Sequence, residues 1–158
     1  MRKPKKSSSF AIAHLKVKKM KNRREENGFR IASDRIGELE DNEIFVFGSN
    51  IHGMHGGGAA WFAMQRFGAI LGQGEGLQGR SYALPTMEGF ESMKAAVGRF
   101  IDYARVHQEY IFLVTAIGCG IAGYSEDEVA PLFKDALSLK NVYLPEVFCK
   151  NASLNEKR

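Results

Sequence analysis

Two glycine-rich segments hold the residues with the clearest chemical potential. The first, GSNIHGMHGGG, spans residues 48–58, and the second, AIGCGIAGYS, spans residues 116–125. Because glycine has no Cβ, backbone amides in such segments can come close to a ligand, and successive amides near a helix start form an anion-binding concavity. We therefore expect phosphate as the guest. Two such turns facing one crevice would hold an extended anion, such as a diphosphate with a sugar at either end.

Histidine and cysteine side chains in these segments suggest other chemistry. His52 and His55 are three residues apart, but a zinc site needs three or four ligands and no acid or cysteine lies in this turn, so we expect neither a metal site nor a cofactor. His55 is a candidate for contacting phosphate or for delivering a proton near neutral pH. Cys119, at an expected helix start, would have a lowered thiol pKa if exposed. It is either a nucleophile paired with one of the histidines or a small residue facing phosphate.

One acidic residue is a candidate for catalysis. Glu75 lies in LGQGEGLQGR, residues 71–80, which has the composition of a mobile surface loop. If this loop folds over the crevice, the Glu75 carboxylate could activate a water or hold a ribose hydroxyl. The alternative is a solvated loop charge.

The elements that must position these residues alternate between strands and helices. Apolar runs predict strands at 43–47, 81–85 and 110–118, the last one central, and an edge strand at 141–148 that contains Pro145. Helices are expected at 59–69 and at 90–106. The first is so apolar that we expect the Trp61 side chain to be buried in the core. Another starts at Ser125, where Glu128 completes a capping box and Pro131 marks a kink or a short first turn.

This order predicts an α/β fold with a mostly parallel, mixed sheet in a three-layer α/β/α arrangement. Ligands of such sheets bind where parallel strands end, which is where both glycine segments lie. Neither segment is a P-loop, and no dinucleotide-binding fingerprint follows the first strand, so the sequence does not favour an ATPase or a dehydrogenase.

Composition bounds the rest of the chain. At 158 residues, 44% apolar and 25% charged, it has the averages of a globular domain with one core. No apolar run is long enough to cross a bilayer and cysteines are few, so we expect a cytoplasmic protein without membrane contact. We divide it into a basic leader at 1–30, disordered or partly helical, with a basic helix at 10–26, an α/β domain at 31–150 and a polar tail at 151–158.

The leader supports an alternative function. Residues 1–30 carry eleven Lys or Arg against two Glu, whereas the remainder of the chain is mildly acidic. A basic arm of this kind can bind a phosphate backbone. The alternative is therefore a nucleic-acid interaction protein in which the α/β unit is a scaffold.

The series FVFGSN, HGGGAAWFAMQRFGA and FLVTAIGCGIAGYSEDEVA resembles the macro domain, a family that binds ADP-ribose. The resemblance covers roughly residues 43–137. It implies that Asn50 hydrogen-bonds the distal ribose, that the 56–58 loop wraps the diphosphate and that the 118–124 loop holds the phosphates. It also makes Asp34 a candidate for reading the adenine amino group, with a solvated side chain as the alternative.

The sequence also departs from the family. Hydrolases of the family often carry an acid where this chain has Ala60, so hydrolysis of an ADP-ribosyl linkage stays open. The family commonly has an aromatic where this chain has Ala122, which would leave the distal ribose less enclosed. The catalytic candidates are Asn50 and Glu75. The residues expected to bind the ligand are Gly48, Ser49, Asn50, His55, Gly56, Gly57, Gly58, Gly118, Cys119, Gly120, Ile121, Ala122, Gly123 and Tyr124.

Overall fold

The computed structural model describes residues 17–157, with side chains as far as Asn151, and contains two sheets. The larger sheet has the strand order β5-β6-β4-β7-β8. Strands β4, β6, β7 and β8 run parallel, and β5 is antiparallel to β6, so the expected mixed α/β architecture is confirmed. Its strands are β4 (Glu43–Ser49), β5 (Gly76–Gln78), β6 (Ser81–Pro85), β7 (Ile111–Val114) and β8 (Val142–Tyr143).

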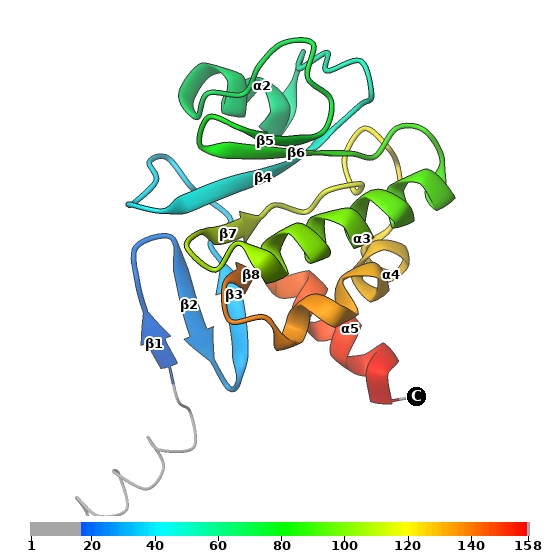
Figure 1. The fold of residues 1–158 in the computed structure, drawn as a ribbon. Helices are drawn as coiled ribbons and strands as arrows, with labels where there is room; N and C mark the ends of the chain where they lie inside the picture. The colour runs from blue at the N-terminus through cyan, green and yellow to red at the C-terminus, as the bar shows by residue number, and fades with distance from the viewer. Residues whose placement is uncertain (1–16, 158) are drawn as a thin grey trace, which may run out of the picture.

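Helices follow four of these strands, β4, β6, β7 and β8 (Figure 1). They are α2 (Gly58–Arg66), α3 (Phe90–Val106), α4 (Glu126–Val129), the 3₁₀ helix η1 (Ala130–Ser138) and α5 (Glu146–Lys157). The Ser125 capping box is present: its hydroxyl accepts from the Glu128 amide, and the Glu128 carboxylate accepts from the Ser125 amide. Pro131 lies at the start of η1, so it marks a short first helix followed by a tighter one.

Side chains of β4 alternate between two buried clusters. Ile44 and Val46 belong to a cluster that includes residues of α3, η1 and α5. Phe45 and Phe47 belong to a second cluster with Ala60 and the other buried residues of α2. Because successive strand residues point to opposite faces, both faces of the sheet are covered. The continuous apolar run at 110–118 predicted a strand covered on both faces, but β7 ends at Val114, so the expected C-terminal half of that strand is wrong.

Trp61 does not belong to the core, and its expected burial is wrong. Its side chain is 48% exposed, because α2 faces the sheet with Ala60 and Ala63. Small residues allow α2 to approach β4 closely, which turns the larger Trp61 outward.

The N-terminal segment forms a second sheet, so the expected basic helix over 10–26 is wrong for residues 17–26, while residues 10–16 lie outside the described part. Strands β1 (Val17–Lys19), β2 (Arg23–Glu26) and β3 (Phe29–Ala32) are antiparallel. The β2–β3 turn consists of Asn27 and Gly28, both with positive φ, which is the favoured chemistry of a two-residue hairpin. This Asn-Gly pair was the signal in the sequence for the hairpin.

A buried carboxylate ties this sheet to the body of the protein. Glu43 is 1% exposed and accepts hydrogen bonds from Asn22 Nδ2 (2.8 Å), Arg23 Nε (3.0 Å) and the Glu40 amide (2.9 Å). The Ala32 amide also donates to the Leu144 carbonyl. The 17–32 segment is therefore packed against the α/β unit.

The C-terminal expectations need two corrections. The strand expected at 141–148 ends at Tyr143, because α5 begins at Glu146, directly after Pro145. β8 is nevertheless the last strand of its sheet, as Pro145 suggested. Residues 151–157, expected as a polar tail, continue α5. Among the described residues, no helix has the length and apolar content needed to cross a bilayer.

Candidate functional site

A cavity of about 580 Å³ lies at the carboxyl edge of the sheet. Strands β4, β6 and β7 are parallel, so the segments that follow them meet at one edge (Figure 1). All three segments contribute to the cavity, as does the first turn of α2. The lining residues are Gly48, Ser49, Asn50, Met54, Gly56, Gly57, Gly58, Ala59, Ala60, Thr86, Met87, Thr115, Ala116, Ile117, Gly118, Gly120, Ile121 and Ala122.

The structure thus brings the two glycine segments together. Of the residues expected to bind a ligand, ten lie in this cavity: Gly48, Ser49, Asn50, Gly56, Gly57, Gly58, Gly118, Gly120, Ile121 and Ala122. The residues that also line the cavity but were not expected to bind a ligand are Met54, Ala59, Ala60, Thr86, Met87, Thr115, Ala116 and Ile117. Thr86 and Thr115 directly follow β6 and β7, so their place at the ends of parallel strands was the available signal.

Backbone amides of both segments lack partners among the described residues. No hydrogen bond joins the amides of residues 56–60 to any other described group, and Gly57 caps α2 without a side-chain acceptor. In the second segment the amides of Gly118 and of residues 120–122 are likewise without a described acceptor. Both groups of amides belong to residues that line the same cavity. These residues supply backbone hydrogen-bond donors, and none of them has a charged side chain.

The conformation of the first glycine segment is stabilised by the Asn50 side chain and by the packing of Gly74 against it. Asn50 Nδ2 donates to the Met54 carbonyl and Asn50 Oδ1 accepts from the Met54 amide, each at 3.1 Å. The Asn50 amide group therefore pins the turn and keeps one N–H and one lone pair for a ligand. Gly74 packs against the backbone of Asn50 and Ile51 so closely that an added Cβ would overlap it.

The second segment is closed against the helices beneath it. Gly118 has a φ of +77°, and a Cβ there would meet Met93 Sδ at 2.9 Å. The Tyr124 amide donates to the Gly118 carbonyl at 2.9 Å, and the Tyr124 ring packs edge-on to Phe90. Tyr124 thus packs beneath the bend and is not part of the cavity lining, and neither is Gly123.

His55 and Cys119 also lie outside the cavity lining. His55 is 1% exposed, with Nε2 3.3 Å from Gln78 Oε1 and its ring edge-on to Phe47, so it packs within the fold. Burial raises the pKa of the Cys119 thiol, with Glu126 and Glu128 adding to the rise, so the expected lowering of this pKa is wrong. His52 is exposed, and no described hydrogen bond pairs Cys119 with either histidine.

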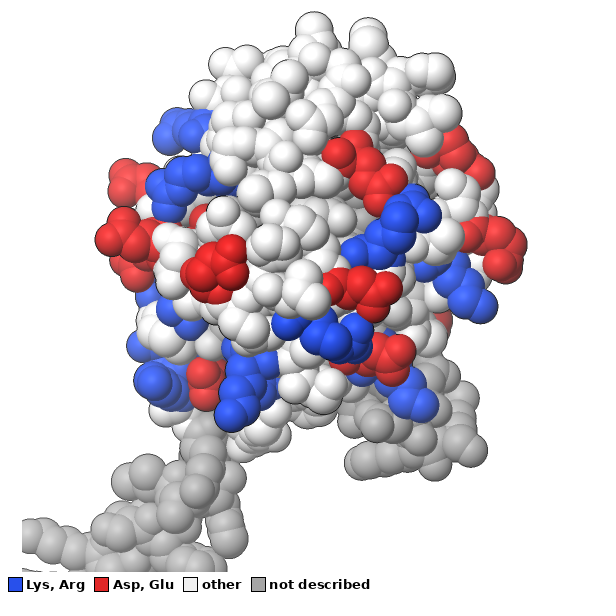
Figure 2. All heavy atoms as spheres, in the orientation of Figure 1, with Lys and Arg blue, Asp and Glu red and all other residues white. Residues whose placement is uncertain are grey.

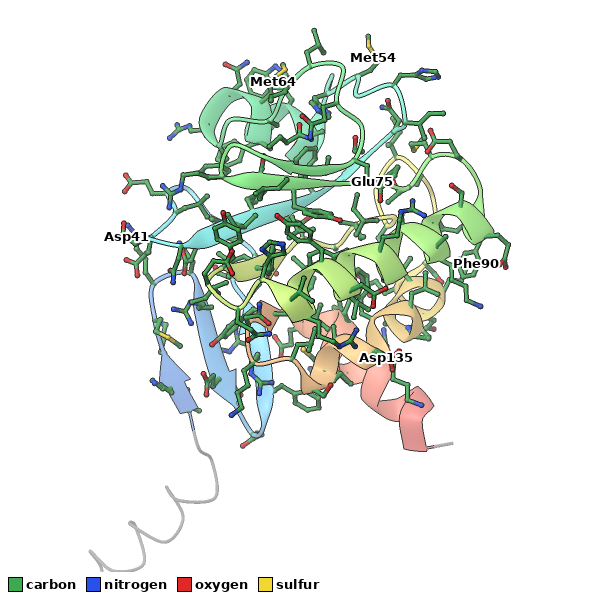
Figure 3. The ribbon with its side chains drawn as sticks, viewed as in Figure 1. Asp41, Met54, Met64, Glu75, Phe90 and Asp135 are labelled. Carbon is green, nitrogen blue, oxygen red and sulfur yellow. The ribbon has the colours of Figure 1, made fainter. Side chains whose placement is uncertain are left out.

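Glu75 lies in an ordered segment and points to α3. The expected mobile loop at 71–80 contains β5, which pairs with β6. Glu75 Oε2 and Oε1 accept from Arg99 Nε (2.7 Å) and Nη2 (2.9 Å), and Figure 3 shows Glu75 between β5 and α3. Glu75 is absent from the cavity lining, which contains no titratable side chain at all.

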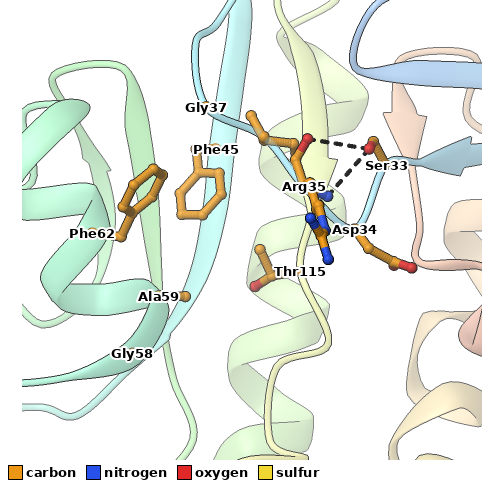
Figure 4. Close-up of a pocket in the computed structure, with 10 residues that line it drawn as sticks. Ser33, Asp34, Arg35, Gly37, Phe45, Gly58, Ala59, Phe62 and Thr115 are labelled. Carbon is orange, nitrogen blue, oxygen red and sulfur yellow. Dashed lines mark hydrogen bonds between the residues drawn. The ribbon is translucent and has the colours of Figure 1, made fainter.

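A second cavity, of about 530 Å³, adjoins the first and shares Gly58, Ala59 and Thr115 with it. Figure 4 shows Phe45 and Phe62 on one side of this cavity and Ser33, Asp34 and Arg35 on the other, with Thr115 between them. The Phe45 and Phe62 rings meet edge to face at 6.2 Å. Asp34, the candidate for reading adenine, therefore lies in a partly aromatic cavity beside the glycine segments.

Within residues 17–157 no group of three or more His, Cys, Asp or Glu residues is placed to hold a metal ion. Comparisons of the chain with family models, with curated proteins and with solved structures found no match.

Proposed function

We propose that this protein binds a nucleotide diphosphate of the ADP-ribose type in the cavity at the carboxyl edge of its larger sheet. The observation that carries the proposal is the set of unpartnered amides contributed by the 56–60 and 118–122 segments to one cavity. Backbone N–H groups at a helix start and in a glycine bend are natural donors to phosphate oxygens. A diphosphate could accept from both sets at once.

The adjoining cavity suits the adenosine end of such a ligand. Phe62, half-buried and edge-on to the buried Phe45, offers aromatic surface to a base, and the exposed Asp34 carboxylate could accept from an amino group. The two cavities share three lining residues, so base, sugar and diphosphate can run continuously from one to the other. Within the proposal, the fold is a three-layer arrangement of the macro-domain type.

The proposal is binding without hydrolysis. General acid or base catalysis needs a titratable group within reach of the ligand, and the larger cavity is lined by none. Ala60 stands where hydrolases of the macro family often have an acid, and Glu75 is engaged by Arg99.

The nucleic-acid alternative finds less support in the described part of the leader. Arg23 pairs with Glu43, Arg24 pairs with Glu26 and Glu146, and Lys21 pairs with Glu38. Cations that already have carboxylate partners gain less from a phosphate backbone. Lys18 and Lys19 are exposed, and residues 1–16, which carry five further Lys or Arg, lie outside the described residues.

A thermal-shift panel with ADP-ribose, ADP, AMP and adenosine tests the proposal. We expect ADP-ribose at a hundredfold excess over its Kd to raise the melting temperature by about 5–10 °C, and AMP and adenosine to raise it less. Incubation with ADP-ribosylated protein should release no ADP-ribose. No shift with any diphosphate would contradict the proposal, and turnover would contradict its restriction to binding.

Gly57→Val is the matched variant for this experiment. Gly57 has an extended backbone (φ −163°), and an added Cβ meets no atom within 4 Å, so valine should fold without strain. Because Gly57 lines the cavity, we expect the variant to lose at least tenfold in ADP-ribose affinity and to melt within about 2 °C of the wild type. Gly98→Ala, on an exposed position of α3, is the control that should bind normally.

A further inference from the structure

Three exposed apolar side chains surround the larger cavity. Met54 follows β4, Met87 follows β6 and Ile121 follows β7, and their exposed fractions are 63%, 43% and 93%. All three line the larger cavity and none lines the adjoining one. We call these three residues the apolar rim. Figure 3 shows Met54 directed away from the body of the molecule.

The surface around the apolar rim offers no cation to a ligand. Residues 50–65 contain no Lys, Arg, Asp or Glu, and the upper part of the face in Figure 2, over α2 and neighbouring loops, is correspondingly uncharged. Residues 86–93 and 116–129 contain five carboxylates and no Lys or Arg. This surface disfavours a polyanion such as a polynucleotide, and equally any second phosphate or carboxylate at the outer end of the ligand.

The rim also fits poorly with a bare sugar. A ribose whose hydroxyls meet methionine and isoleucine side chains gives up hydrogen bonds to water without replacing them. A neutral planar ring loses little on leaving water and gains apolar and sulfur–aromatic contacts.

From these features we infer that the ligand is a free dinucleotide whose second ribose carries a heteroaromatic ring against Met54, Met87 and Ile121. The inference rests on the proposed function, because it takes the adenosine and diphosphate positions from it. It adds a specificity determinant, since the apolar rim then selects for a second base rather than for ADP-ribose itself.

Diadenosine diphosphate and ADP-ribose form a matched pair of probes. They share adenosine, diphosphate and second ribose, and differ in that adenine replaces the terminal hydroxyl at C1′ of the second ribose. Burying on the order of 60 Å² of the added ring against the rim corresponds to about a tenfold lower Kd. In calorimetric titrations of the full chain, we expect diadenosine diphosphate to bind about tenfold more tightly than ADP-ribose.

The triple variant Met54→Ser, Met87→Ser, Ile121→Ser tests whether the apolar rim causes the preference for diadenosine diphosphate. We expect the ratio of the two dissociation constants to fall toward one in this variant and to stay unchanged in Leu71→Ser, an exposed apolar position outside both cavities. ADP-ribose binding without any preference for diadenosine diphosphate would overturn the inference and leave the proposed function standing. A preference that survives in the triple variant would also overturn it. Absence of binding by both nucleotides would overturn the proposed function as well.

Discussion

Glu75 illustrates how a single side chain can look catalytic in a sequence and be structural in the fold. Its glycine-rich segment suggested a mobile loop that could fold over the crevice. In the structure this segment is fixed, because Gly74 packs against the backbone of Asn50 and Ile51. The carboxylate turns to Arg99, whose guanidinium pKa is raised mainly by its hydrogen bond with Glu75. Such a pairing depends on where α3 lies relative to β5, which the local sequence does not encode.

Glu75→Gln should therefore leave nucleotide binding unchanged. The Glu75–Arg99 pair is partly exposed on both sides, so we expect its loss to cost less than about 1 kcal/mol of unfolding free energy. Urea unfolding and ADP-ribose titration of the variant measure the two quantities. A loss of affinity beyond twofold would show that Glu75 reaches the ligand and that our assignment of this residue is incorrect.

The segment of β5 and its flanking turns acts as a support for the first glycine segment. Besides the contact of Gly74, the Gly72 amide donates to the Gly53 carbonyl, and Gly68 and Gly79 pack backbone to backbone. The richness in glycine that predicted mobility instead permits close packing between backbones. Composition cannot distinguish these two outcomes, because the partner segment is distant in sequence.

Gly74→Ala tests this support. Its added methyl would overlap the Asn50 and Ile51 carbonyls, whereas in Gly56→Ala the methyl meets nothing within 4 Å. Neither glycine has a positive φ, so the difference in stability between the two variants reports the steric overlap of the added methyl at residue 74. We expect Gly74→Ala to lower the free energy of unfolding by about 1–3 kcal/mol more than Gly56→Ala does, as measured by urea denaturation. Equal stability of the two variants would mean that the segments do not pack as described.

For the molecule as a whole, buried acidic groups predict a loss of stability in alkali. Burial raises the pKa of the Cys149 thiol from 9.0 to about 11, and burial also raises the pKa of Tyr143. Above pH 9 the unfolded chain releases the Cys149 proton while the folded protein keeps it. The stabilisation is therefore complete below pH 9 and is lost as the pH rises toward 11.

Denaturant unfolding between pH 8 and pH 11 should show this decline. Cys149 contributes up to about 3 kcal/mol of it by pH 11. Cys149→Ser removes the titrating thiol with little change of shape, so its stability should fall less steeply over the same range. Parallel pH profiles for the wild type and this variant would contradict the role given to Cys149.

How much of the molecule the sequence predicts depends on how local each signal is. The strand at 43–47, the helix at 90–106 and the Ser125 capping box follow from periodicity and spacing within a few residues, and the structure confirms them. Parallel strands then explain why both glycine segments reach one edge. The hairpin at 23–32 also has a local signal, its Asn-Gly turn, although the basic composition of the segment favoured a helix. The outward Trp61 and the apolar rim depend on contacts between distant segments, and these emerged only from the structure.

Backbone amide resonances observed by NMR during titration with ADP-ribose test the central claim most directly, because they report the donors themselves. We predict that the amide signals of Gly56, Gly57, Gly58, Gly118 and Gly120 shift progressively and saturate together, while those of Gly28 and Gly98 stay in place. Saturable binding that leaves the first five signals unmoved, or the absence of any shift at millimolar nucleotide, would contradict the account.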